Sequence, residues 1–488
     1  MSKLKRNTTW VRDARNPILP QQPGSDYDCG GCMNPWIMQE GDQYYLYYAG
    51  WGADRHRRVC LATAPVGQAG EWERQGPVLQ LGEHGEFDGN WCVLPHVVKL
   101  DDREWRLYYT GNSGIGTGLD MFPGLGMAFS EDGKHFIKHD RNPIIARTGQ
   151  EGDPDQQGIA GGSVIQARLP DGTVQWRFYY TGCPTLGKDV FLNQQKQICL
   201  AVSQDGIEWE KQGAIMQRNP LHDYENVAVA GPIVQQLADD SYRMWYSAIG
   251  TRWGYYSICY AESDDGLSWN RGTHYGDNLQ LGPRHGTAGN WESMMVEYPS
   301  VIEEDGHLRL FYTANNYGLT GIGTAVSTRL RATADHDGAH IASSGSGSAC
   351  SLRLPEYVAW GSAVRRLSSP LAWQGPDANG MIWYEQTIVP GLRLRAIVTH
   401  GEQSLGLQMT LINQSGEALR GLKACVRLIA LDEAALPAIE WAGPIRVSAE
   451  SRASSALAAT GLAGEMAFAL ELDDLPDGGT ATITGTLG

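Results

Sequence analysis

Acidic residues recur at one position of a repeated pattern in this chain. Each repeat has a Pro or Gly that opens a short apolar run, at positions 35, 95, 162, 232 and 299, and the residue seven places earlier is always Asp or Glu. These acids are Asp28, Asp88, Asp155, Glu225 and Glu292. Two carboxyl groups that face one bond between sugars can cleave it, because one protonates the leaving oxygen while the other activates water or attacks the sugar. This chemistry makes Asp28, Asp155, Glu225 and Glu292 the candidate catalytic residues.

The same acids have simpler explanations that the sequence leaves open. Asp and Glu are common in turns, where they accept hydrogen bonds from backbone amides, and this explains one or two of the five. The ungapped alignment of the repeats, on which this position depends, is also one of two possibilities. If the GNW of residues 89–91 is aligned with the GNW of residues 289–291, Ala288 stands opposite Asp88 instead of Glu292.

Polar and aromatic residues near the same markers are candidates for substrate contacts. Tryptophan rings stack on sugar faces, and amide, imidazole and carboxyl groups bond hydroxyls. The candidates are Asn34, Asp88, His96, Trp291, Glu297 and Asn315, with Trp51 and Trp91 as further rings for stacking.

Charge and composition narrow the range of partners. The 488 residues include 55 acidic and 39 basic ones, for a formal net charge of −16, so nucleic acids and anionic membrane surfaces are repelled. The N-terminus MSKLKRNTTW lacks a following apolar run, and no stretch approaches the length of a membrane span. We expect a cytoplasmic protein with a neutral carbohydrate substrate, no nucleic acid and no membrane.

Cysteine spacing gives no sign of a disulfide framework or a cofactor. The nine cysteines are scattered, and several lie inside strand-like runs where a thiol acts as a small apolar residue. The pair Cys29 and Cys32 lacks the second pair that a zinc site needs. We expect no required cofactor; a structural Ca²⁺ stays open because of the carboxylates, although no loop has the spacing of a calcium motif.

The elements that must position these residues are β-strands. Five segments share one order: an apolar run, a Tyr-rich run such as WRLYYTGN (105–112), a small-residue run such as CLAVSQDG (199–206), and an aromatic run such as WEKQGAIM (209–216). Units of four antiparallel strands that recur about every 60–70 residues are typical of a β-propeller. The fifth unit lacks its fourth strand, and WVRDARNPIL (10–19) matches FIKHDRNPII (136–145), which closes the second unit. We therefore predict that the N-terminus supplies the missing strand.

The pattern ends near residue 330. A Gly- and Ser-rich stretch follows, and later segments such as LRLRAIVTH (392–400) alternate apolar and polar residues, as in a β-sandwich. The predicted architecture is all-β: a five-bladed propeller over 1–332, a linker over 333–350 and an accessory sandwich over 351–488, through which the chain could form a homo-oligomer.

The repeat resembles the five-bladed propeller glycosidases. The motifs that carry the likeness are SQDGIEW (203–209), SDDGLSW (263–269) and YRMWYSA (242–248). The families are the arabinanases and xylosidases, the invertases and fructanases, and the mannoside phosphorylases, with ESMMVEYPSVIEEDGHLRLFYTANNYGLTGIG (292–323) similar to the last blade of uncharacterised bacterial relatives. The resemblance implies a glycoside hydrolase that cleaves a small glycoside or oligosaccharide, with furanosides among the candidate substrates.

The resemblance also implies roles for single residues and leaves some of them open. In the arabinanase order Asp28 is the base, Asp155 tunes a pKa and Glu225 is the acid, whereas Asn34 stands where those families have an Asp before Pro35. Their acid lies two residues before a Pro, as Glu297 does here, and Glu292 is a further candidate.

Two other functions stay open. A phosphorylase needs a cluster of Arg, Lys or His for phosphate, and the one dense basic stretch of the repeats is DRHRR (54–58), which we expect to be a solvated turn away from the site. The other function is that of a non-catalytic propeller that binds carbohydrate, which needs no paired acids.

Overall fold

A computed structural model describes most of the chain. The described residues are 4, 6–116, 118–184, 195–273, 275–284, 290–304, 307–328, 330–335, 338–343, 349–367, 371–377, 380–401, 404–430, 446–448 and 465–487. The described chain is almost entirely β, with one 3₁₀ turn, η1 (Gly118–Met121), and one short helix, α1 (Asn315–Gly318). No helix in this part is long and apolar enough to cross a membrane.

The chain divides into two compact units. The first holds residues 1–4 and 12–326, and the second holds residues 5–11 and 327–488. Part of the expected linker, 333–350, is strand instead: β22 (Leu330–Asp335) pairs with β23 (Gly338–Ser343), which pairs with β24 (Ala349–Trp360). The alternating pattern of ATADHDGAHIAS was overlooked because the Gly and Ser residues beside it suggested a loop.

The first unit is built from antiparallel strands in the predicted order. The first strands are β2 (Gly31–Glu40), β6 (Trp91–Asp101), β11 (Gly158–Arg168), β15 (Ala228–Gln236) and β19 (Val296–Glu304). The second strands are β3 (Gln43–Trp51), β7 (Glu104–Asn112), β12 (Val174–Cys183), β16 (Tyr242–Ile249) and β20 (His307–Ala314). The third strands are β4 (Arg57–Pro65), β8 (Gly124–Ser130), β13 (Gln197–Ser203), β17 (Tyr256–Ser263) and β21 (Ile322–Ser327).

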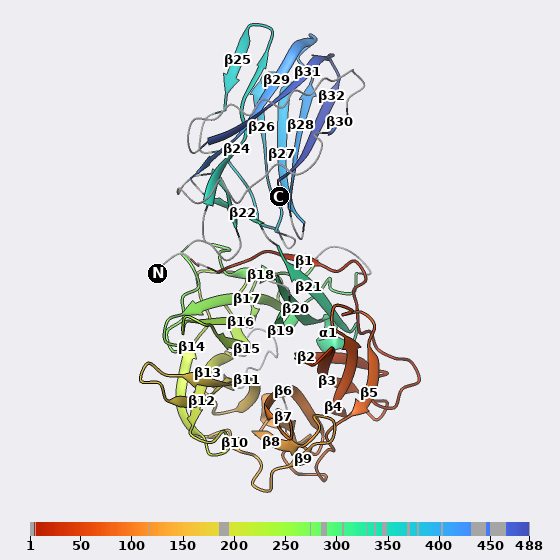
Figure 1. The fold of residues 1–488 in the computed structure, drawn as a ribbon, viewed down its shortest axis with the longest axis vertical. Coiled ribbons are helices and arrows are strands. Elements are labelled where there is room, and N and C mark those ends of the chain that lie inside the picture. Colours follow the sequence, from red (N-terminus) through yellow and green to blue (C-terminus); the bar gives the residue numbers. More distant parts are fainter. Residues whose placement is uncertain are drawn as a thin grey trace. The chain divides into compact units, whose positions relative to one another are not determined.

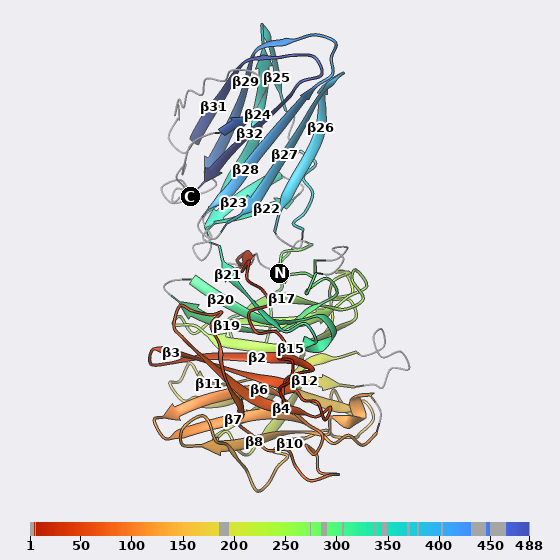
Figure 2. The ribbon, with the colours of Figure 1, turned by 90° about the vertical axis from the view of Figure 1, so that its right-hand side faces the viewer.

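Short outer strands complete the repeats. They are β1 (Trp10–Arg12), β5 (Glu73–Pro77), β9 (Ile137–Lys138), β10 (Ile145–Ala146), β14 (Glu210–Met216) and β18 (Leu279–Leu281). Three repeats are separate four-stranded sheets, and the first two join through one parallel pair, Arg57 with Trp91. In Figure 1 the first strands lie around the middle of this unit and β5, β9 and β14 lie at its rim. Figure 2 shows the same strands from the side.

The N-terminal segment occupies the vacant position of the fifth repeat. The sheet order is β1-β21-β20-β19, so the chain start pairs with the third strand of that repeat. Asn16 bonds the Tyr312 hydroxyl at 3.3 Å and accepts from the Thr324 amide at 2.8 Å. Asn142 makes the same two contacts in the second repeat, with Tyr109 and Met127. The two RNPI segments therefore make equivalent hydrogen bonds in their repeats.

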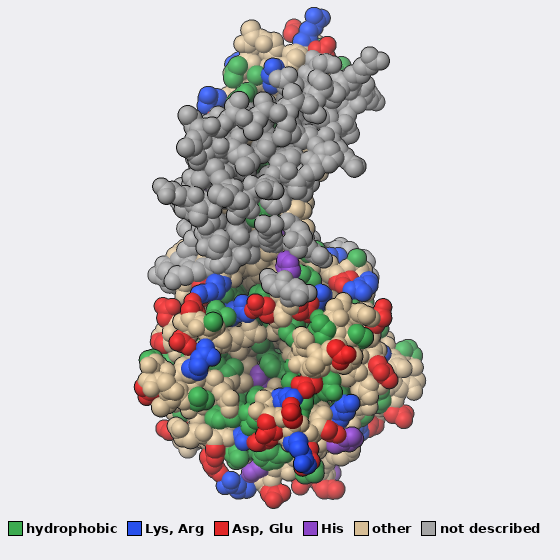
Figure 3. Space-filling model, in the orientation of Figure 1, with side chains coloured by type: hydrophobic (Ala, Val, Ile, Leu, Met, Phe, Trp, Pro, Cys, Tyr) green, Lys and Arg blue, Asp and Glu red, His purple; other side chains and the backbone are tan. Residues whose placement is uncertain are grey.

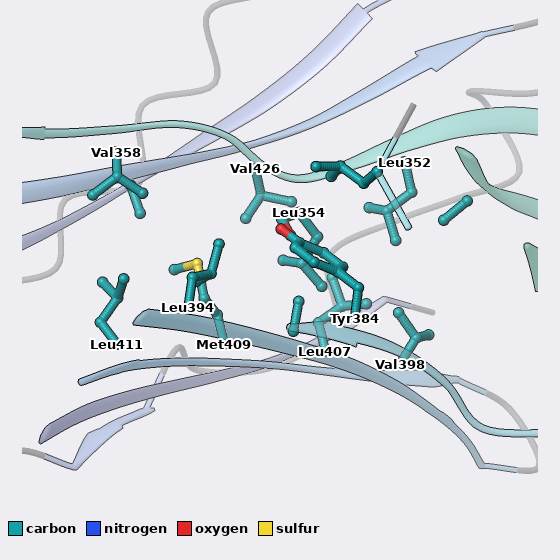
Figure 4. Packing of buried hydrophobic residues seen from close by; sticks show 14 of the residues in the cluster. Leu352, Leu354, Val358, Tyr384, Leu394, Val398, Leu407, Met409, Leu411 and Val426 are labelled. Atoms are coloured by element: carbon teal, nitrogen blue, oxygen red, sulfur yellow. The ribbon is translucent and has the colours of Figure 1, made fainter. Parts of the chain in front are cut away.

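The second unit contains two antiparallel sheets. One has the order β22-β23-β24-β29-β31 with β25 on β24, and the other β26-β27-β28-β32-β30. The remaining bounds are β25 (Ala363–Arg366), β26 (Ile382–Val389), β27 (Leu392–His400), β28 (Leu405–Asn413), β29 (Leu419–Ala430), β30 (Arg446–Ser448), β31 (Glu465–Leu475) and β32 (Thr480–Leu487). Apolar side chains of both sheets form one buried cluster, in which Leu354 and Val426 lie opposite Tyr384 and Leu407 (Figure 4).

Candidate active site

A bulge interrupts each first strand at the same place. The pairing with the second strand skips between Met33 and Trp36, and it skips at the equivalent position of the other four repeats. The residue before the marker has a left-handed backbone in four repeats, with φ of 54° at Asn34, 52° at Leu94, 56° at Gly231 and 51° at Tyr298. A bulge changes the direction in which the side chains of a strand point, and each of the five first strands has such a bulge.

Hydroxyl side chains of the neighbouring repeat hold these bulges. The amides of Gly161, Gly231, Tyr298 and Asn34 donate to the oxygens of Thr110, Thr181, Ser247 and Thr313, at 2.6, 2.9, 2.8 and 2.8 Å. Each hydroxyl belongs to the Tyr-rich strand of the repeat before, and Thr313 of the fifth repeat reaches Asn34 of the first. The Tyr-rich strand therefore serves to orient the next repeat.

A cavity of about 300 Å³ lies where the bulges meet. Its walls come from all five repeats, and the residues two positions before four of the markers, Met33, Val93, Ala160 and Ala230, line it. Figure 3 shows a hollow in this unit with hydrophobic side chains inside it. The volume is at the lower end of the about 300–1,000 Å³ of small-molecule sites.

Glu297 holds the same position in the fifth repeat. Its side chain is fully buried, and neither carboxyl oxygen has a hydrogen-bond partner among the described residues. Burial raises its pKa well above the ordinary value, although the charges of Lys196 and Arg57 oppose this. Burial thus favours the protonated form of Glu297, which has an O–H to give.

Two cations line the cavity beside this carboxyl. The Arg57 guanidinium lies between two indole rings, 4.3 Å from the centroid of Trp51 and 3.9 Å from that of Trp91. Burial lowers its pKa to about 10, so it keeps its charge at neutral pH. The Lys196 ammonium donates to the Tyr256 hydroxyl at 2.6 Å. Neither cation forms an ion pair with a carboxylate of the described residues.

DRHRR is thus not the solvated turn that we expected. Arg57 begins β4 and points into the cavity, while Arg58 pairs with Asp54 outside it. Trp51 and Trp91, expected as sugar platforms, cover the two faces of Arg57 instead.

Of the predicted substrate contacts, Asn34 lines the cavity and His96 does not. The Asn34 side chain is 2% exposed, and neither its oxygen nor its nitrogen has a partner in the described chain. His96 lies against Trp36, with ring centroids 3.7 Å apart, and its Nε2 is 2.9 Å from the Val164 carbonyl oxygen. Burial lowers the pKa of His96 to about 3, so its neutral ring serves packing.

The five repeated acids do not meet at a channel mouth. Each is at most 1% exposed and is enclosed in its own repeat. Each accepts from a tyrosine of the second strand at 2.7–3.2 Å; the tyrosines are Tyr48, Tyr109, Tyr180, Tyr246 and Tyr312. Each also pairs with a cation of the outer segment at 2.6–3.2 Å; the cations are Arg74, Lys138, Lys211, Arg271 and Arg12. This triad of acid, tyrosine and cation joins the outer segment to the inner strands of each repeat.

The fourth and fifth repeats add further partners to the triad. Burial acts to raise the pKa of Glu225, but the bond with His222, the charge of Arg271 and the bonds with Tyr246 and Asn278 together lower it. Glu292 has a second guanidinium, that of Arg284, at 3.1 Å. A carboxylate whose pKa is lowered in this way is a poor proton donor, so Glu225 does not suit the part of the acid.

The other predicted contacts also lie outside the cavity. Trp291 packs on Tyr312 with ring centroids 5.6 Å apart. The Asn315 side-chain oxygen accepts from the amides of Met294 and Met295, so this residue supports a turn. Among the described residues no three His, Cys, Asp or Glu side chains gather as a group that could hold a metal ion.

Comparison with known proteins identifies relatives of this chain. No protein-family model matches it. Two sequences from Mycobacterium tuberculosis, "Uncharacterized protein Rv1502" (strain H37Rv) and "Uncharacterized protein MT1551" (strain CDC 1551), are 30% identical over 297 residues, 60% of this chain and 89% of each relative. The chain belongs to the family of these two proteins.

Solved structures resemble the chain over about two thirds of its length. The structure of BT0996 in an RGII complex is 16% identical with a TM-score of 0.50 and covers 67% of this chain and 91% of its own. Another, described as "Glycoside hydrolase", is 16% identical with a TM-score of 0.49 and covers 67% and 92%. The likeness is one of fold. Glycoside hydrolases are among these structures.

Arg57, Lys196, Tyr256 and Tyr298 were missed from the sequence. The usable signal was the residue two places before each marker, which is apolar in the first two repeats, alanine in the next two and acidic only at Glu297. Nothing in the sequence indicates Lys196, because its place at the cavity depends on the approach of two repeats.

Proposed function

We propose that this protein cleaves a glycosidic bond by phosphorolysis in the central cavity, with Glu297 as the proton donor. The observation that carries the proposal is a buried carboxyl group without a hydrogen-bond partner next to two cations without a carboxylate partner, all among the described residues. A perturbed acid in a cleft with specific charges around it is typical of a reacting group.

Burial favours the protonation state of Glu297 that the first step needs. A neutral carboxyl gives its proton to the leaving oxygen as the bond from that oxygen to the sugar carbon breaks. Tyr256, Tyr298 and Tyr317, which line the cavity, all interact electrostatically with Glu297, so the buried carboxyl lies close to the cavity wall.

Arg57 and Lys196 suit an anionic partner. Charge-assisted hydrogen bonds to phosphate are strong. The Arg57 guanidinium is held between two indole rings, so its orientation is fixed before an anion binds. Hydrogen phosphate, held by these cations, attacks the sugar carbon through one oxygen and passes its proton to the Glu297 carboxylate. The products are a sugar 1-phosphate and a free alcohol, and Glu297 regains its proton.

Hydrolysis by paired carboxylates, our first expectation, finds less support. It needs a second carboxylate near the reacting carbon. Among the described cavity residues the place before Pro35 is taken by Asn34, whose amide is no base. In the hydrolytic alternative, a water molecule held by Asn34 accepts the glycosyl group in place of phosphate.

We further propose that residues 10–327 form five blades and that the second unit is a β-sandwich. Five triads of acid, tyrosine and cation and the chain of hydroxyl bonds that returns from Thr313 to Asn34 support five blades. One apolar cluster shared by two sheets supports the sandwich.

The test is turnover of nitrophenyl furanosides and pyranosides with and without inorganic phosphate. We expect phosphate-dependent release of nitrophenol, its near loss in Glu297→Gln, and a raised KM for phosphate in Arg57→Gln and Lys196→Gln. Release without phosphate would make the protein a hydrolase, and binding without turnover would make it a binding protein.

A further inference from the structure

One side of the cavity offers no side-chain hydrogen bond to a ligand from its described residues. It is formed by the second repeat, including its segment between β7 and β8, and by the third repeat; its residues are Trp91, Val93, Leu94, Met121, Phe122 and Ile159. The single polar group among them, the Trp91 indole N–H, already donates to the Arg55 carbonyl at 3.3 Å. The polar lining residues include Asn34, Arg57, Lys196 and three tyrosines, and the Arg57 guanidinium lies 3.9 Å from the centroid of the Trp91 ring at the edge of this apolar wall.

The fold does not require a large side chain at the centre of the apolar wall. Leu94 has a left-handed backbone, with φ of 52°, which a leucine rarely adopts. The third and fourth repeats have Gly161 and Gly231 at the equivalent position. Strained residues of this kind tend to occur at ligand sites. Leu94 therefore brings an isobutyl group to the cavity where glycine satisfies the backbone.

Two aromatic rings of the wall lie next to each other. Trp91 and Phe122 have ring centroids 5.9 Å apart with a tilt of 55°, and Phe122 and Leu94 are only partly buried although they are apolar. A sugar placed here would leave hydroxyls without partners, which is costly, whereas an aryl or alkyl group would gain by leaving water.

We infer that the apolar wall binds the leaving group of the substrate, and that this leaving group is an apolar alcohol, aromatic or alkyl, instead of a second sugar. The inference rests on the proposed cleavage beside Glu297. The sugar then lies by Asn34 and Glu297, phosphate lies by Arg57 and Lys196, and the apolar alcohol lies on Leu94 and Phe122. The proton from Glu297 goes to the oxygen of this alcohol, which leaves uncharged.

The test measures binding separately from turnover. Full-length Glu297→Gln is titrated by calorimetry with phenyl glycosides, with methyl glycosides and with disaccharides of the same sugars, drawn from a panel of furanosides and pyranosides. For the sugar that binds, we expect the phenyl glycoside to bind about tenfold more tightly than the methyl glycoside and the disaccharide.

Leu94→Asn, made in the Glu297→Gln background, tests the wall itself. Asn tolerates a left-handed backbone, so this variant keeps the fold while it adds a polar group. We expect the preference for phenyl to fall to about twofold or less. Leu221→Asn is the matched control, because Leu221 is 80% exposed and lies outside the cavity, and it should leave the preference unchanged. Phe122→Ala provides a second variant of the wall.

The outcomes separate the two proposals. A phenyl preference that depends on Leu94 and Phe122, without turnover in the wild type, upholds the apolar wall and refutes the phosphorolysis. Turnover of disaccharides with no phenyl preference upholds the reaction and refutes the apolar leaving group. A phenyl preference that both wall variants retain also refutes it, and so does a panel in which no glycoside binds.

Discussion

The position of a carboxyl group within its repeat decides what it can do. Seven residues before the marker, Asp155 accepts from Tyr180 and pairs with Lys211, and its charge is neutralised inside one repeat. Two residues before the marker, Glu297 is fully buried next to the cavity residue Tyr298, and neither of its carboxyl oxygens has a partner among the described residues. The first arrangement stabilises a repeat, and the second leaves a proton to donate.

Substitution of a triad acid should cost stability without removing the chemistry. In Asp155→Asn the ammonium of Lys211 loses its partner, and breaking a buried pair costs about 3–5 kcal/mol. We expect a loss of this size in the free energy of unfolding, measured by urea denaturation. The folded fraction should keep the activity of the wild type, and Asp264→Asn, at an exposed position, should change neither quantity.

Glu297 should make stability depend on pH in a defined direction. Its folded pKa lies well above the ordinary value of 4.5, so between these two values the folded state holds a proton that the unfolded chain has released. The stability of the wild type relative to Glu297→Gln is therefore highest below pH 4.5 and falls by about 1.4 kcal/mol per pH unit up to the folded pKa. Urea denaturation of both proteins at about pH 5 and about pH 7 measures this difference; a constant difference would mean that Glu297 is ionised.

At the scale of elements, two kinds of bond hold each repeat in register. The triad ties the outer segment to the inner strands, and the hydroxyls of Thr110, Thr181, Ser247 and Thr313 tie each bulge to the repeat before it. The N-terminal segment takes part through Arg12, which bonds Glu292 at 2.9 Å.

Loss of the Arg12 side chain should loosen the fifth repeat. In Arg12→Met the buried Glu292 keeps Arg284 but loses a partner that is itself buried, so we expect a destabilisation of about 3 kcal/mol. Amide exchange should rise in β21, next to β1, before it rises in β12. The double variant Arg12→Met, Glu292→Met should recover part of the loss, whereas equal losses in the single and double variants would assign the effect to packing.

At the scale of the whole molecule, the cavity depends on the first unit alone. All its described lining residues lie between Met33 and Tyr317. The 297 residues shared with the mycobacterial relatives are 89% of those proteins but 60% of this chain, so the relatives are about two thirds as long. The full length of this chain is therefore not shared by these members of the family. Homo-oligomer formation through the second unit stays a prediction.

A chain that ends after residue 328 should keep the reaction. We expect it to unfold cooperatively and to cleave the same glycoside with the kcat/KM of the full chain, because every described cavity residue is retained. Calorimetry and the nitrophenyl assay measure the two quantities. A folded truncation with strongly reduced kcat/KM would show that the second unit contributes to the site.

The sequence by itself determined the all-β repeats, their four-strand order and the use of WVRDARNPIL as the closing segment, because hydrophobic alternation and turn residues are local signals. It also singled out Asn34 and Glu297. Only the tertiary structure decided which acid is buried with neither carboxyl oxygen bonded to a described residue. The bulge in each first strand breaks the alternation of side chains. In the fifth repeat the bulge lies between Glu297 and Ser300, and its residue Tyr298 lines the same cavity as Arg57 and Lys196, which are distant in the sequence. A count of residues along one strand cannot anticipate where five bulges converge.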